Sequence, residues 1–151
     1  MLSVDPLIIS NNILSIAYKE NIKITPMKLQ KLLYFVYRDY LKETNEPLFS
    51  ERFEAWKYGP VISRVYNEFS HYKDKPIDEF YKDSKGMSYK LKEESNPIFS
   101  KVLYRIWEKY KYYSGIELSK ITHEVGSAWY KAWCNSEIYI NDEDIISENV
   151  G

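Results

Sequence analysis

The strongest constraint on the fold is a repeated pattern, in which a proline opens a segment whose apolar residues recur every three or four positions. Asp5-Pro6 and Thr25-Pro26 open two such segments, and Pro97 opens another. A side-chain oxygen before the proline caps a helix, and proline suits the first helical position because the N–H it lacks is not used there. The apolar spacing places these side chains on one helical face. The pattern predicts helices over residues 6–20, 26–43 and 97–113.

The remaining segments predict shorter elements. Gly59-Pro60 is a clear break, since glycine permits unusual backbone angles and proline restricts the residue before it, and a helix over 61–72 follows. Short helices are expected over 116–122, 127–135 and 144–148. Residues 73–96 are polar and interrupted by Pro76 and Gly86, so we expect a variable loop region there. The fold class is therefore mainly α, a compact single-domain bundle of about five to seven helices spanning residues 1–151. A short β segment near residues 50–58 remains an alternative to an irregular loop.

Composition narrows the class of protein. Hydrophobic residues make up 44% of the 151 residues and charged residues 28%, which is typical of a folded soluble domain. The net charge of −1 disfavours a domain built to hold nucleic acid, which is usually clearly basic. No apolar run approaches the length of a membrane helix, and the N-terminus does not resemble a signal peptide. We therefore expect a cytoplasmic protein that does not use a membrane.

The predicted helix over 26–43 carries cations whose environment is left open. Lys28, Lys31, Arg38 and Lys42 fall largely outside its apolar face. One interpretation is an ordinary solvated face. The other is a basic and aromatic patch for nucleic acid, formed together with a second group of residues. That second group comprises Lys109, Lys111, Tyr112 and Tyr113.

Aromatic residues are unusually frequent, with 15 Tyr, 6 Phe and 4 Trp making up 17% of the chain. Tyrosine is enriched in protein interfaces because it combines an apolar ring with a polar tip. Codon usage in an AT-rich genome explains the same excess. Composition alone therefore does not choose between an interface and a genomic bias.

Few residues favour catalysis. His123 and Glu124 are adjacent, so on a helix they do not face each other, and they lack the wider ligand set that a metal needs. His71 has no partner motif, and the single cysteine, Cys134, is expected to be a buried structural thiol. No glycine-rich phosphate-binding motif is present. We expect a protein that is not an enzyme and that uses no cofactor or metal.

Three motifs occur in an order and spacing that resemble a known family. The first runs from Thr25-Pro26 through Leu29-Gln30-Lys31 to Phe35, and the second is Ala55-Trp56-Lys57-Tyr58-Gly59-Pro60-Val61 within residues 47–66. The third is Thr122-His123-Glu124 followed by Gly126-Ser127-Ala128-Trp129. Together they resemble the Panacea domain, which is found in bacterial and phage antitoxins and in phage-associated proteins. The resemblance extends over about residues 5–147.

The resemblance implies a protein-binding module. Some members neutralise toxins by direct binding, and the family is similar to a proteolytic-adaptor antitoxin that delivers its toxin to a protease. Family antitoxins often carry an additional variable region, for which this chain has little room unless residues 73–96 serve. We expect an antitoxin with a protein partner; the alternatives are a phage-encoded protein that inhibits a host defence or host enzyme, and a DNA-binding autoregulator. The expected partner-binding residues are Glu54, Trp56, Lys57, Tyr58, Arg64, Tyr66, His123 and Trp129.

Overall fold

The computed structural model describes residues 3–151, and within them the chain is mainly α-helical, as predicted. This part of the chain contains seven α-helices, one 3₁₀ turn and a single β-hairpin. None of these helices is long and apolar enough to cross a membrane. The elements are α1 (Pro6–Glu20), α2 (Pro26–Thr44), β1 (Glu54–Trp56), β2 (Gly59–Val61), α3 (Ser63–Phe69), η1 (Ser70–Tyr72), α4 (Pro97–Tyr110), α5 (Gly115–Thr122), α6 (Ala128–Cys134) and α7 (Asp142–Ser147).

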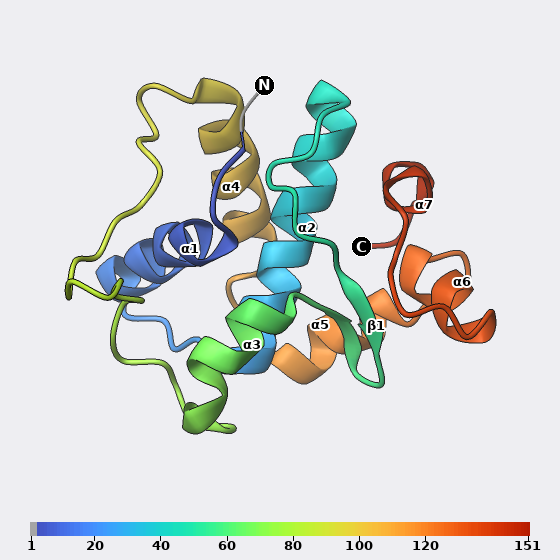
Figure 1. Cartoon of the computed structure of the whole chain (residues 1–151), viewed down its shortest axis with the longest axis horizontal. Helices are drawn as coiled ribbons and strands as arrows, with labels where there is room; N and C mark the ends of the chain where they lie inside the picture. The colour runs from blue at the N-terminus through green and yellow to red at the C-terminus, as the bar shows by residue number, and fades with distance from the viewer. Residues whose placement is uncertain (1–2) are drawn as a thin grey trace.

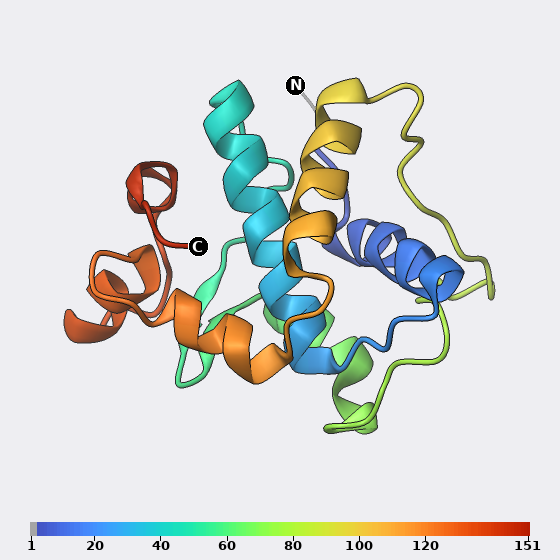
Figure 2. The same ribbon diagram turned by 180° about the vertical axis from the view of Figure 1, so that it is seen from behind.

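Helix α2 lies at the centre of the molecule. It contacts α1, α3, α4, α5, α7 and strand β2, and Figures 1 and 2 show these elements arranged around it. Every residue from Lys28 to Arg38 is buried, so this helix has no solvent face along three turns. Its leucine, phenylalanine and tyrosine side chains form the middle of one continuous hydrophobic core.

The predicted helix starts are confirmed at the capped positions. Asp5 accepts a hydrogen bond from Leu7 N at 2.9 Å, and Thr25 accepts one from Lys28 N at 3.3 Å. A capping box formed by Ser114 and Glu117 starts α5. Each side chain satisfies an N–H group that the first helical turn leaves without a partner.

Several predicted boundaries are corrected by local pairing. Val61 belongs to β2, paired with Glu54, so the third helix begins at Ser63 instead of 61. Helix α4 ends at Tyr110 instead of 113, because the chain turns there to enter the capping box of α5. The last helix begins at Asp142 instead of 144, which places three acidic residues in its first turn, where the helix dipole favours them. The segment near 50–58 does contain the short strand β1.

Three of the four basic side chains of α2 are buried, which neither interpretation offered above expected. Lys28, Lys31 and Arg38 are each 5% exposed or less, whereas Lys42 is exposed. Arg38 forms a buried ion pair with Glu148 at 2.9 Å. Because α2 is enclosed by other elements, Lys28, Lys31 and Arg38 point into protein and do not contribute to the basic and aromatic patch of the second interpretation.

Residues 73–96 contain no helix or strand, as expected, yet they are held against α1. The buried Asn12 side chain donates to Leu91 O at 2.9 Å and accepts from Leu91 N at 2.8 Å. Asn11 makes the same pair of contacts with Tyr81, at 3.0 and 2.8 Å. Figure 1 shows this loop running along the outer side of α1, away from the hairpin.

Candidate functional site

The β-hairpin is formed by the second sequence motif and contacts residues of the first and the third. Its strands pair in the register Glu54 with Val61, Ala55 with Pro60 and Trp56 with Gly59, so Lys57 and Tyr58 form a two-residue tip. The free edge of β1 is covered by a later segment, since Ala55 N donates to Ile138 O at 2.8 Å. The outer edge of β1 is therefore paired with the segment that follows α6.

Three successive carbonyl groups of the hairpin tip accept hydrogen bonds from the third motif and helix α5. Trp129 Nε1 lies 2.6 Å from Trp56 O, and His123 Nε2 lies 2.8 Å from Lys57 O. Ser119 Oγ donates to the next carbonyl, that of Tyr58, at 2.6 Å. These contacts fix the backbone of the tip and leave its side chains free.

Helix α2 holds the opposite side of the hairpin. Lys31 Nζ donates to Pro60 O at 3.0 Å. The Gln30 amide pairs with both main-chain groups of Ile62, accepting from N at 3.1 Å and donating to O at 3.2 Å. Burial lowers the pKa of Lys31 from 10.5 to about 7, because the low-dielectric interior disfavours its charged form.

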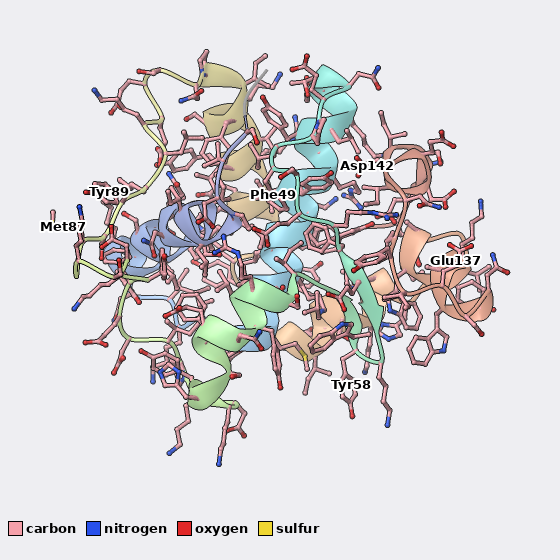
Figure 3. The ribbon with its side chains drawn as sticks, in the orientation of Figure 1. Phe49, Tyr58, Met87, Tyr89, Glu137 and Asp142 are labelled. Carbon is pink, nitrogen blue, oxygen red and sulfur yellow. The ribbon has the colours of Figure 1, made fainter. Side chains whose placement is uncertain are left out.

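The free side chains form an exposed aromatic surface. Tyr58 is 58% exposed at the tip, and Figure 3 shows it projecting away from the body of the molecule. Trp56 is half-buried and packs edge-on against the exposed ring of Tyr66, with centroids 4.9 Å apart. Lys57 Nζ lies 5.5 Å from the centre of the Tyr58 ring. Rigid aromatic side chains on a fixed backbone are typical of protein-binding hot spots.

Six of the eight predicted site residues fall into two groups in the structure. Trp56, Lys57, Tyr58 and Tyr66 lie together on the exposed side of the hairpin and α3. His123 and Trp129 lie behind it, with ring centroids 3.8 Å apart, and hold the tip through its carbonyl groups.

The remaining two predicted residues make contacts of their own. Glu54 accepts a hydrogen bond from Trp56 Nε1 at 3.1 Å, which orients the indole. Arg64 pairs with Asp5 and with Glu51, the latter at 2.9 Å, and these carboxylates raise its pKa. Arg64 therefore ties α3 to the start of α1.

Sequence reasoning missed Trp133 as a surface residue. It is 47% exposed and stacks on Trp129, with ring centroids 5.2 Å apart. Trp133 also lines a hollow beside Trp56 and Ile138, so it extends the aromatic surface across β1. The spacing of four residues between Trp129 and Trp133 was the available signal, because residues four apart share a helical face.

Other candidates from the sequence have simpler environments. Cys134 is exposed, so the expectation of a buried thiol was wrong: it lies at the last position of α6 instead of on the face that packs inward. His71 is exposed. Within residues 3–151 no group of three or more His, Cys, Asp or Glu side chains is arranged to hold a metal ion.

Gly59 should be essential for the geometry of the tip. Its φ of +118° is unfavourable for other residues, and an added Cβ would lie 2.7 Å from Thr122 Oγ1 and 2.8 Å from Lys31 Cε. We expect Gly59→Ala to lower the free energy of unfolding by about 2–5 kcal/mol in urea titration. Gly86→Ala is the matched control, since φ is also positive there but no atom lies within 4 Å. Equal losses in the two variants would contradict this account of the tip.

The burial of Lys31 predicts a specific pH dependence. Between pH 7 and 10.5 the unfolded chain retains the proton on this lysine and the folded chain releases it, so stability rises with pH. Relative to Lys31→Met, the wild type should gain about 1.4 kcal/mol per pH unit across this window. Denaturant titrations of both proteins at several pH values measure the trend. A stability difference that stays constant with pH would show that Lys31 is not desolvated in the folded chain.

Comparison with known proteins agrees with the motifs that build this site. The sequence profile described as "Antitoxin SocA-like, Panacea domain" matches residues 29–130. Antitoxin SocA of Caulobacter vibrioides (strain NA1000 / CB15N) is 44% identical over 68 residues, which cover 45% of this chain and 36% of that protein. The chain thus matches little more than a third of the length of this curated relative, and no solved structure matches it significantly. Since the profile spans most of the chain, the protein belongs to the antitoxin SocA-like, Panacea-domain family.

Proposed function

We propose that this chain is an antitoxin that binds a protein toxin directly through the aromatic surface around the hairpin tip. The observation that carries the proposal is the exposed Tyr58 on a backbone whose carbonyl groups are all held from behind. An anchor that is rigid before binding loses little conformational entropy when it binds. Membership of the family, and the name of the relative from Caulobacter, support an antitoxin role.

The surface has the composition expected of an interface centre. Tyr58, Tyr66 and Trp133 are each more than 40% exposed, and Trp56 lies between them. Tryptophan and tyrosine dominate the binding energy of characterised interfaces, where they fill pockets from which water is excluded. Hollows on either side of Trp56 and Tyr58 offer such pockets to side chains of a partner.

A second surface competes for the same role. The loop of residues 73–96 exposes Met87 and Tyr89 at the left edge of Figure 3, well apart from Tyr58 at its lower edge. If this loop is the variable, toxin-specific region, the partner contacts it and not the hairpin. Since Tyr89 is 54% exposed, it matches Tyr58 closely in residue type and accessibility.

Paired tyrosine variants distinguish the two surfaces. The chain is co-expressed with the protein encoded beside it, and growth rescue, copurification and Kd are measured. We expect Tyr58→Ala to weaken binding by about 2 kcal/mol or more, roughly thirtyfold in Kd, without a loss of thermal stability. Tyr89→Ala should retain binding.

The opposite pattern would place the interface on residues 73–96. A chain that neither copurifies with its neighbour nor rescues growth would contradict the antitoxin proposal itself. Measuring the level of the toxin in rescued cells separates blocking from delivery to a protease: the toxin persists in the first case and disappears in the second.

A further inference from the structure

A pocket of about 400 Å³ opens between the start of α2, the hairpin and α3. Its apolar walls come from Met27, Trp56, Tyr58, Val61 and Tyr66. Both the volume and the predominance of apolar and aromatic walls are typical of sites that bind a specific ligand. Trp56 and Tyr58 thus face this pocket as well as belonging to the aromatic surface.

The charged groups of this pocket are all positive. Lys31, Lys57 and Lys73 line it, and none of the described Asp or Glu side chains does. Lys57 and Lys73 are exposed at the rim, whereas Lys31 is 1% exposed. A ligand that brings a negative charge between these lysines would be complementary to the pocket.

Lys31 supplies a second, independent observation. Its ammonium group carries three N–H donors, and in the described part of the chain it makes a single hydrogen bond, to Pro60 O. Buried N–H donors that lack an acceptor are unfavourable. A carboxylate in the pocket would provide both the acceptors and the opposite charge.

We infer that this pocket receives a segment of the protein partner in which a carboxylate lies beside a large apolar or aromatic side chain. The ring packs against Met27, Trp56 and Tyr66, where sulfur and aromatic edges favour it. The carboxylate pairs with Lys31 and the rim lysines. This inference rests on the proposed function, because it assumes that the ligand is part of a protein that the aromatic surface binds.

Selection from a phage-displayed library of random linear peptides tests the inference without the partner. The full chain and its Lys31→Met variant are immobilised in parallel, after circular dichroism has shown that the variant folds. Peptides enriched on the wild type should carry Asp or Glu adjacent to Phe, Tyr or Trp. A synthetic copy of the strongest peptide should lose about tenfold or more in affinity when its acid is replaced by the amide. The same loss is expected on Lys31→Met.

Two further variants keep the test decisive. Lys109→Met removes an exposed lysine on α4 that does not line the pocket, and it should bind the peptide like the wild type. If Lys31→Met does not fold, the double variant Lys57→Met/Lys73→Met removes the rim charges instead, and it should weaken binding several-fold.

Other results would overturn the inference. The inference fails if no peptide is enriched, or if the enriched peptides are acidic but have no apolar residue beside the acid. It also fails if the peptide binds all the lysine variants equally. Because no toxin takes part, failure here leaves the antitoxin proposal intact. Conversely, if the chain binds such peptides but does not rescue growth, the inference about the pocket stands and the antitoxin proposal fails.

Discussion

The structure depends on how the polar side chains of helix α2 are satisfied after burial. A helix enclosed by other elements along three turns cannot leave cations and amides in water, so each must find a partner in the surrounding chain. Lys31 donates a hydrogen bond to the main chain of the hairpin, and the Gln30 amide pairs with the main chain of Ile62. Arg38 finds Glu148, which also accepts hydrogen bonds from Tyr34 Oη and Ala128 N at 2.8 and 2.9 Å. The hairpin and the C-terminal helices are thereby tied to the same central helix.

This arrangement explains why the three sequence motifs belong together. The first motif supplies Gln30 and Lys31, the second is the hairpin, and the third supplies His123 and Trp129. The first and third motifs donate hydrogen bonds to main-chain carbonyl groups, and the second motif supplies those carbonyl groups. Lys31 and His123 thus contact the main chain of the hairpin, and the side chains of Tyr58 and Tyr66 stay exposed.

Sequence patterns predicted the parts of the fold that local chemistry determines. Helix starts follow from Asp5, Thr25 and the prolines after them, because a cap acts within one turn. The burial of Lys31 was not predictable, since spacing shows which residues share a face but not that other elements cover every face. Strands of three residues are too short to show an alternating pattern, so a β segment near residues 50–58 remained an alternative to a loop, and Val61 of β2 was assigned to a helix.

Residues of the candidate site that are adjacent in the sequence were predictable, whereas contacts between distant residues were not. Trp56 and the two tip residues, Lys57 and Tyr58, are consecutive, so a single motif identified them together. The supporting roles of His123 and Trp129 arise from contacts between residues 66 and 73 positions apart in the chain. Such long-range contacts leave no trace in local spacing.

The central claim is that α2 and the third motif hold the hairpin rigid so that its outer face binds a partner. Hydrogen–deuterium exchange of the full chain, alone and bound to a copurified partner, tests this claim most directly. The account predicts slow exchange at residues 54–62 in the free chain and added protection on binding at 56–60 and 133–138. Rapid exchange of the hairpin in the free chain, or added protection confined to residues 73–96, would contradict it.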